Sequence, residues 1–407
     1  MTVEIERPMD MDIVHPEIDF ATDPVPNLQQ ITGALRERGR FFAVNRHGEK
    51  AILATRFDDV NFAFGDETDI PLSAGAKKFA EPAQGRSLFS MTGDEHRLHR
   101  ALIAAAFTGS AIDCYERDLM IPEARAALGK LKLADGEVAD LIGDFAEMYG
   151  ISVIVRILGL PVEEDQRFRR WAHDLVSSSW ALDKAMQASR EFEAYVTPII
   201  QERRQGAGDD FLSRLARAEI DGKRLADIDI VSFLRVLFPA GADTTFRQLG
   251  NLIVVMLTIP GLKQTLMANR ALIPQAIDEA LRWEPAIGLY PRLVPRDVVW
   301  RGAFIPAGTF LLLSVVSANR DPRLFDDPDT FDLNRRGKKI TTFGAGIHFC
   351  IGAVLARREM AVAVNTLLDL YPDLELADPE GTCITGATLR GPAELMVRCG
   401  QRNGAPR

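Results

Sequence analysis

The sequence predicts a mainly α-helical protein with a small β region, which places it in the α+β class. From residue 94 to residue 212 apolar side chains recur almost wholly at helical spacing, and the breaks fall at glycines. A long helix, Leu225–Thr258, follows and ends before a Pro-Gly step. Strand-like patterns with turn residues are confined to three stretches, near residues 41–56, 298–316 and 383–398.

The first part of the chain is expected to hold a helix, a hairpin and a long loop. Leu28–Arg38 has helical spacing and is followed by a glycine. Phe41–Val44 and Ala51–Thr55 flank a turn that contains His-Gly, which predicts a hairpin. After a short helix at Asp58–Phe64, residues 66–92 look irregular, and a loop of that length in a compact protein is often functional.

The helical part is expected near residues 94–282 and again near 351–370. Its helices are predicted at His96–Phe107, Cys114–Leu131, Leu141–Leu158, Glu163–Ser177, Lys184–Gln205, Leu225–Thr258 and Leu272–Arg282. Strands at 298–316 and a loop rich in Asp and Pro, Asn319–Arg336, separate the two helical stretches. No internal repeat or linker divides the chain, so a single domain over residues 1–407 is predicted.

Composition narrows the class of protein. The chain has 407 residues and 47% hydrophobic content, enough for a large core, and its formal net charge of -9 argues against a nucleic-acid binder. Its four cysteines have neither zinc-site nor disulfide-scaffold spacing, which fits a reducing compartment. The acidic N-terminus does not resemble a signal peptide, and no apolar run approaches the roughly 18 to 20 residues of a membrane span. A soluble cytoplasmic protein, with no membrane span, is expected.

The stretch Thr341–Gly352 concentrates chemical signals. It holds three glycines and Cys350, and a run with helical spacing follows directly. Cys350 would therefore lie at a helix N-terminus, where unbonded N–H groups and the helix dipole favour a negative charge. These conditions favour the thiolate form of cysteine, which binds metal or acts as a nucleophile. A buried structural cysteine is the competing interpretation. A dinucleotide-binding fingerprint is excluded, because position 349 is phenylalanine where that motif needs glycine.

Three other clusters of polar residues are weak signals when each is taken alone. Pro239 and adjacent threonines are poor helix formers, so the long helix is expected to open locally beside Asp243 and Thr244; a kinked core helix is the alternative. Glu279 and Arg282 are spaced to pair on one helix face. His96 and Arg100 share another helix face, and Arg292 lies between a helix and a strand. These cations could bind an anion or lie solvated.

Taken together, these motifs resemble those of one family, the cytochrome P-450 monooxygenases. The pattern Phe-Gly-x-Gly-x-His-x-Cys-x-Gly at residues 343–352 resembles the family's haem-binding signature. The other matches are His96-x-x-x-Arg100 to the propionate-binding helix, Ala240-Gly241-x-Asp243-Thr244 to the oxygen-activation motif and Glu279-x-x-Arg282 to the buried ion-pair motif. The resemblance covers nearly the whole chain and is strongest to the soluble bacterial branch.

The resemblance implies a fold, a cofactor and residue roles. It implies a triangular helical prism with haem b between the long central helix and the helix after Cys350, which would be the axial thiolate ligand of the iron. The implied roles are packing beside the thiolate loop for Phe343, propionate binding for His96, Arg100, Arg292 and His348, proton supply for oxygen activation for Asp243 and Thr244, and a structural ion pair for Glu279 and Arg282. One departure is Thr330, where many family members have an arginine; Arg335 or Arg336 is expected to replace it.

The same resemblance implies a hydrophobic small-molecule substrate and external electron donors. Apolar positions expected at the substrate pocket are Leu88, Phe89, Leu237, Ala240, Ile287 and Leu289, with core packing as the alternative for each. Since no flavin or iron–sulfur module is present, a ferredoxin and its reductase would supply electrons to a monomer. A basic face of Arg97, Lys338, Arg357 and Arg358 could steer an acidic ferredoxin, or could simply be solvated.

The leading hypothesis is a monooxygenase that inserts one oxygen atom of O2 into an apolar substrate. One alternative is a haem-thiolate binding or sensor protein without turnover, and another is a peroxide-driven hydroxylase. Asp243 and Thr244 favour the monooxygenase, because neither alternative needs a proton relay.

Overall fold

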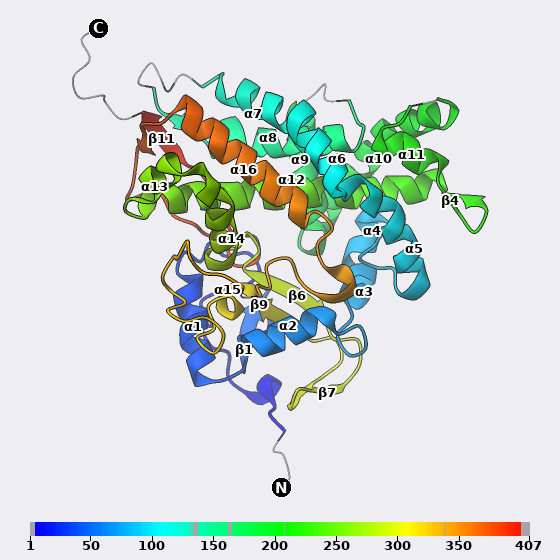
Figure 1. Ribbon diagram of the computed structural model, residues 1–407. Coiled ribbons are helices and arrows are strands. Elements are labelled where there is room, and N and C mark those ends of the chain that lie inside the picture. The colour runs from blue at the N-terminus through cyan, green and yellow to red at the C-terminus, as the bar shows by residue number, and fades with distance from the viewer. Residues whose placement is uncertain are drawn as a thin grey trace. The chain divides into compact units, whose positions relative to one another are not determined.

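The chain forms two compact units. The computed structural model describes residues 5–131, 133, 137–161, 165–206, 208–337 and 339–399 (Figure 1). The sheet unit comprises Met1–Lys78, Asp278–Cys350 and Ile384–Gly391, and the helical unit comprises Phe79–Ile277, Ile351–Cys383 and Pro392–Arg407. The single-domain organisation stays a prediction.

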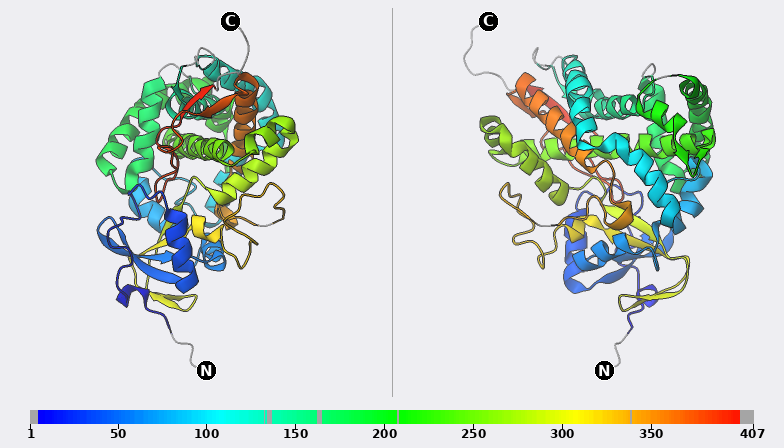
Figure 2. Two further views of the ribbon diagram at one scale, coloured as in Figure 1. Left: turned by 90° about the vertical axis from the view of Figure 1, so that its left-hand side faces the viewer. Right: turned by 45° about the vertical axis from the view of Figure 1, so that its right-hand side comes forward.

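The sheet unit is built on a four-stranded sheet of order β1-β2-β9-β6. Its strands are β1 (Phe41–Arg46), β2 (Glu49–Ala54), β9 (Phe310–Ser314) and β6 (Leu289–Leu293). β1 and β2 form the predicted hairpin, whose two turn residues, His47 and Gly48, both have positive φ, as a tight two-residue turn requires. β9 is parallel to β2 and antiparallel to β6, so segments far apart in sequence lie side by side (Figure 2).

Both faces of this sheet are covered by apolar side chains. On β9, Leu311 and Leu313 belong to one buried cluster, whereas Leu312 belongs to another, because successive side chains of a strand point to opposite faces. The remaining elements of the unit are α1 (Leu28–Arg38), α2 (Phe57–Gly65), α3 (Leu72–Gly75), α15 (Val315–Ala318), β7 (Val298–Trp300), β8 (Ala303–Ile305) and the 3-10 turns Pro8–Asp10 and Gly346–His348.

The helical unit is organised around α12 (Asp227–Thr258), which packs against α8 (Glu147–Ile157), α9 (Asp165–Val176), α10 (Leu182–Gln205) and α16 (Ala353–Leu370) (Figures 1 and 2). The other helices are α4 (Glu81–Gln84), α5 (Gly93–Ala104), α6 (Gly109–Tyr115), α7 (Ile121–Leu128), α11 (Phe211–Arg217) and α13 (Leu262–Ala268), with α14 (Ile273–Trp283) running from this unit into the sheet unit. Its short strands are β3 (Ala139–Asp140), β4 (Glu219–Ile220), β5 (Lys223–Arg224), β10 (Leu374–Leu376) and β11 (Met396–Cys399).

Two predictions of local structure were wrong. Residues 66–92 contain α3, α4 and a π-helical turn at Ala76–Ala80 instead of an irregular loop. The proline in α4 lies in its first turn, and Gly85 ends that helix with φ 76°, so residues that suggested a loop are start and stop signals. Strand β6 was missed because it contains Pro291, which is tolerated since β6 is an edge strand.

The described residues offer neither a single membrane-spanning helix nor a side-chain cluster for a metal ion. None of their helices alone has the length and apolar character to cross a membrane, and α12 with α13 meets that test only as a pair bent by 100°. The same residues contain no group of three or more His, Cys, Asp or Glu side chains arranged to hold a metal ion.

Candidate functional site

The cysteine-containing loop of the sheet unit is shaped by two glycines and a backbone hydrogen bond. Gly344 and Gly346 both have φ of 69°, which favours glycine. A Cβ on Gly346 would lie 3.1 Å from the Cα of Gly65 in α2, so the loop also needs glycine for close packing. The Cys350 N–H donates to the Phe343 carbonyl over 2.9 Å, and Cys350 is exposed, three residues before α16 begins.

Asn319, which sequence reasoning missed, anchors the start of this loop. It is fully buried, and its Oδ1 accepts hydrogen bonds from the Thr341 N–H at 2.8 Å and the Thr341 hydroxyl at 2.9 Å. Its Nδ2 donates to Thr342 Oγ1 over 2.8 Å. A single asparagine directly after α15 carries no sequence signal for this role, because the loop that it holds begins 22 residues later.

Arg292 and His348, two of the predicted propionate ligands, approach the same carboxylate in the sheet unit. Arg292 Nη1 lies 3.9 Å and His348 Nε2 lies 3.5 Å from Glu67 Oε1. Arg292 is 2% exposed, and its Nη2 donates to the Phe64 carbonyl over 3.3 Å. Its Nε and Nη1 have no hydrogen-bond acceptor among the described residues. A buried guanidinium with such donors fits a carboxylate-bearing cofactor.

The ring of Phe343 contacts the ring of Phe349 within the cysteine-containing loop. Its centroid is 6.4 Å from that of Phe349, and the two rings are tilted by 56°. Ile347 and Phe349 are exposed. This apolar surface around Cys350 suits contact with a flat hydrophobic group.

The ion pair of Glu279 and Arg282 is confirmed, and Arg335 completes it. Arg282 Nη2 donates to Glu279 Oε1 over 2.7 Å, and Arg335 Nε donates to the same oxygen over 3.1 Å. Arg336 instead donates to the Leu333 carbonyl. Thr330, where an arginine was expected, supplies its carbonyl to both Arg282 and Arg335. The open choice between the two arginines is therefore settled as Arg335.

In the helical unit, Asp243 and Thr244 occupy consecutive positions on α12. The Thr244 hydroxyl donates to the Ala240 carbonyl over 2.9 Å, so it competes for a backbone carbonyl one turn earlier in the helix. The predicted opening was wrong: α12 is helical throughout and accommodates Pro239. Gly241 serves packing, since a Cβ there would lie 2.7 Å from Ile154 of α8.

Asp243 belongs to a charged network that sequence reasoning missed. It is 2% exposed, and Arg247 one turn later donates to its two oxygens over 3.0 and 3.2 Å. His173 Nδ1 on α9 lies 3.8 Å from Asp243 Oδ1, and His173 Nε2 lies 2.9 Å from Glu147 Oε1. The hydrogen bond with Glu147, aided by Asp243, raises the pKa of His173. Arg247 could have been found from its i, i+4 spacing, but His173 lies 70 positions away.

The other predicted propionate ligands, His96 and Arg100, are both on α5 of the helical unit. They are one turn apart and therefore share a helix face, and His96 is buried. Each unit thus carries one pair of cationic or imidazole donors: His96 with Arg100 on α5, and Arg292 with His348 beside Glu67.

The predicted substrate residues differ in burial. Leu88 and Leu237 are buried in the core cluster of the helical unit, while Phe89 is partly buried and Ala240 is exposed. Ile287 is partly buried and forms an isolated β-bridge with Leu389. Leu289 is fully buried in a core cluster of the sheet unit, so the alternative of core packing applies to it.

The predicted basic face is largely neutralised where it is described. Arg97 pairs with Asp94 at 3.1 Å, and Arg358 pairs with Asp113 at 3.4 Å and with Glu116. Arg357 donates to the Ala353 carbonyl. Lys338 lies outside the described residues.

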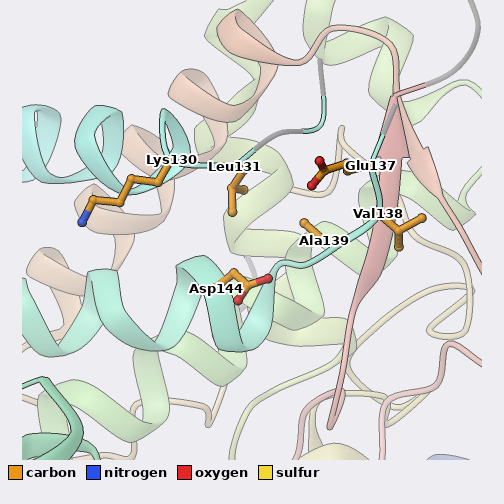
Figure 3. Close-up of a pocket in the computed structure, with 6 residues that line it drawn as sticks. All are labelled: Lys130, Leu131, Glu137, Val138, Ala139 and Asp144. Carbon is orange, nitrogen blue, oxygen red and sulfur yellow. The ribbon is translucent and has the colours of Figure 1, made fainter. Parts of the chain in front are cut away.

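A surface pocket of about 330 Å³ lies in the helical unit, outside this constellation (Figure 3). Its described lining consists of Lys130, Leu131, Glu137, Val138, Ala139 and Asp144. None of the candidate site residues contributes to it, so it is not part of the site.

Comparisons with known proteins agree with this constellation. The family model for cytochrome P450 matches residues 22–378. The mycinamicin IV hydroxylase/epoxidase of Micromonospora griseorubida is 34% identical over 362 residues, which cover 86% of this chain and 90% of that protein. The nocardicin C N-oxygenase of Nocardia uniformis subsp. tsuyamanensis is 33% identical over 363 residues, with the same coverage.

Solved structures of the family match the fold. The P450 enzyme CxnD, described as forming a C–S bond in chuangxinmycin biosynthesis, superposes with a TM-score of 0.85 at 29% identity, covering 96% of this chain and 98% of that one. A myxobacterial P450, CYP267B1, solved with myristic acid, gives the same TM-score and identity over 95% of this chain and 98% of that one. The predicted fold is confirmed. Sequence motifs, fold and relatives therefore agree that the chain belongs to the cytochrome P450 family and is a monooxygenase of the bacterial type.

Proposed function

We propose that this P450 hydroxylates a small hydrophobic molecule, using O2, two protons and two electrons delivered by a ferredoxin and its reductase. The reaction inserts one oxygen atom into a C–H bond and reduces the other to water, so atoms and electrons balance. Family membership implies haem, and we take it to be haem b held by Cys350. Bound haem would supply the redox centre at which O2 is activated.

The chemistry of the donor residues supports this assignment. Cys350 presents an exposed thiol on a loop fixed by glycine geometry and by Asn319. In the sheet unit, Arg292 has two buried N–H groups, on Nε and Nη1, without an acceptor among the described residues, and His348 Nε2 lies 3.5 Å from Glu67, the acid that Arg292 also approaches. In the helical unit His96 and Arg100 share a helix face. We assign these four residues to the two haem propionates, with Phe343 packed beside the thiolate loop.

One observation favours catalysis over simple binding: Asp243 is linked to solvent. The carboxylate is 2% exposed, but its partner His173 has a side chain that is 47% exposed and Arg247 one that is 22% exposed. We infer that protons enter from solvent through His173 and Asp243 and continue to the Thr244 hydroxyl; the 3.8 Å between His173 and Asp243 is longer than a hydrogen bond, so this transfer needs a bridging water or a closer approach of the two side chains. A binding or sensor protein gains nothing from such a path.

The substrate is proposed only by chemical class. The apolar side chains of Leu88, Phe89, Leu237 and Ile287, together with the small exposed Ala240, suit a hydrophobic molecule with few polar anchors. The names of the relatives describe hydroxylation or epoxidation of one compound and N-oxygenation of another. They support the reaction class and do not point to one substrate.

We also propose that the electron donor is an acidic ferredoxin. Among the candidate contacts for an acidic ferredoxin, Arg97 and Arg358 are paired with acids of the protein, and Arg357 donates to the Ala353 carbonyl. We therefore expect moderate electrostatic steering that weakens as salt rises.

Substitution of Thr244 tests the relay. Thr244→Ala should still bind haem and still take up electrons from the ferredoxin. It should divert those electrons from product to peroxide, because the hydroxyl no longer passes protons onward. The matched control is Thr258→Ala, which removes an equivalent hydroxyl-to-carbonyl bond, 2.7 Å to Val254, at the far end of the same helix. Product and peroxide are counted per electron with a ferredoxin system and a substrate chosen by a spin-state screen. Equal product yield per electron in the wild type and Thr244→Ala would contradict the relay.

A further inference from the structure

Glu67 places a protein carboxylate beside the arginine that we assign to a haem propionate. Its Oε1 lies 3.9 Å from Arg292 Nη1 and 3.5 Å from His348 Nε2, and all three residues belong to the sheet unit. The side chain of Glu67 is 25% exposed, whereas that of Arg292 is 1% exposed. A buried guanidinium needs a negative partner, and Glu67 provides one from within the protein.

The segment that carries Glu67 is held in place by its neighbours. Asp66 Oδ1 accepts hydrogen bonds from the Thr68 and Asp69 N–H groups at 3.0 and 2.9 Å. Asp66 Oδ2 accepts from the indole of buried Trp300 over 2.9 Å. Arg296 pairs with Asp69 at 2.7 Å. The backbone on both sides of Glu67 is therefore held by hydrogen bonds and an ion pair, which keeps Glu67 close to Arg292.

Glu67 interacts with Arg292 through its charge and does not determine the orientation of the guanidinium. At 3.9 Å the pair is within ion-pair range but beyond hydrogen-bond distance, and the guanidinium is oriented by the Phe64 carbonyl and by the rings of Phe64 and Tyr290. Burial lowers the pKa of Arg292, while Tyr290, Glu67 and Asp66 oppose that shift. Removing the negative charge of Glu67 should therefore leave Arg292 in place and change only the local potential.

We propose that Glu67 is a built-in competitor of the haem propionate for Arg292. This inference rests on the proposed haem site and goes beyond it. Without cofactor, Glu67 neutralises the buried guanidinium. With cofactor, its charge repels the propionate that shares this guanidinium, which speeds haem loss and lowers the reduction potential of the iron by stabilising its more positive state.

The test is the rate at which the purified holoenzyme passes haem to excess apomyoglobin, followed by absorbance. Glu67→Gln should slow transfer about two- to fivefold, the range that corresponds to a partly exposed ion pair. The same variant should show a more positive reduction potential in a redox titration. Glu67→Asp keeps the charge and should restore both values toward those of the wild type.

Asp69→Asn is the matched control, because it removes one negative charge from the same segment but pairs with Arg296 instead of Arg292. It should leave the transfer rate unchanged. Faster haem transfer in Glu67→Gln, or a rate equal to the wild type, would overturn the proposal. If Glu67→Gln does not fold, Glu67→Ser removes the same charge and is read in the same way. A wild-type chain that takes up no haem would instead contradict the proposed function.

Discussion

Two acid–arginine pairs of similar sequence spacing have opposite surroundings. Glu279 and Arg282 on α14 are 4% and 1% exposed, and Arg282 also donates to the backbone carbonyls of Asn319, Pro328 and Thr330. Asp243 on α12 is equally buried at 2%, but Arg247 is 22% exposed. The first pair is closed to water and fully bonded, while the second opens to solvent. Spacing alone predicts that such charges pair. Only the structure shows that Asp243, unlike Glu279, also has a titratable neighbour, His173, whose side chain reaches solvent.

The largest expected effect comes from breaking the closed pair. Glu279→Ala leaves Arg282 buried without its carboxylate, and removal of one partner of a buried ion pair costs about 3–5 kcal/mol. We expect a large fall in the free energy of unfolding, or insoluble protein, in denaturant titrations of purified protein. An unchanged unfolding midpoint would contradict a stabilising role for the pair of Glu279 and Arg282.

Arg335 and Arg336 provide a sharper test of the same network. Arg335→Ala removes a charge-assisted hydrogen bond to Glu279, and we expect a loss of about 1.5–3 kcal/mol. Arg336→Ala is the adjacent control and should stay within about 0.5 kcal/mol of the wild type, because its hydrogen bonds to the described residues go to nearby carbonyls of its own loop. Both values come from the same denaturant titration, and equal losses in the two variants would reject the assignment of Arg335.

Much of the fold and the chemical core of the site could be predicted from sequence. Helical periodicity predicted α1 with its observed bounds and α12 with a start two residues too early, and the His-Gly turn predicted the first hairpin. The glycine-flanked Cys350 was found because its motif is contiguous. Contiguous signals need no knowledge of tertiary contacts, which is why they were accessible.

The missed features depend on tertiary contacts. His173 reaches Asp243 only because α9 packs against α12, and Asn319 reaches Thr341 only because the chain returns to the end of α15. The choice between Arg335 and Arg336 was open because neighbours in a loop differ in direction, which spacing does not encode. Strand β6 was hidden by its proline, whose tolerance follows from its edge position in the sheet.

The smallest expected effect concerns pH and the open network. The pKa of His173 is raised above its ordinary value of 6.5, chiefly by the hydrogen bond with Glu147. Protonated His173 therefore stabilises the folded state below that value, and the contribution is lost as pH rises through the raised pKa. His173→Gln should lower the melting temperature most at about pH 5.5 and progressively less toward about pH 8.5. A difference that is constant or grows with pH would contradict the ionised network.

The assignment of Cys350 is tested most directly by the absorption spectrum of the reduced protein under carbon monoxide. Thiolate ligation predicts the strongly red-shifted Soret band of a haem-thiolate complex, and Cys350→Ala should abolish it. Cys114→Ala, which removes another exposed cysteine, should leave that band unchanged. A wild-type spectrum of the imidazole-ligated type would contradict the central role given to Cys350.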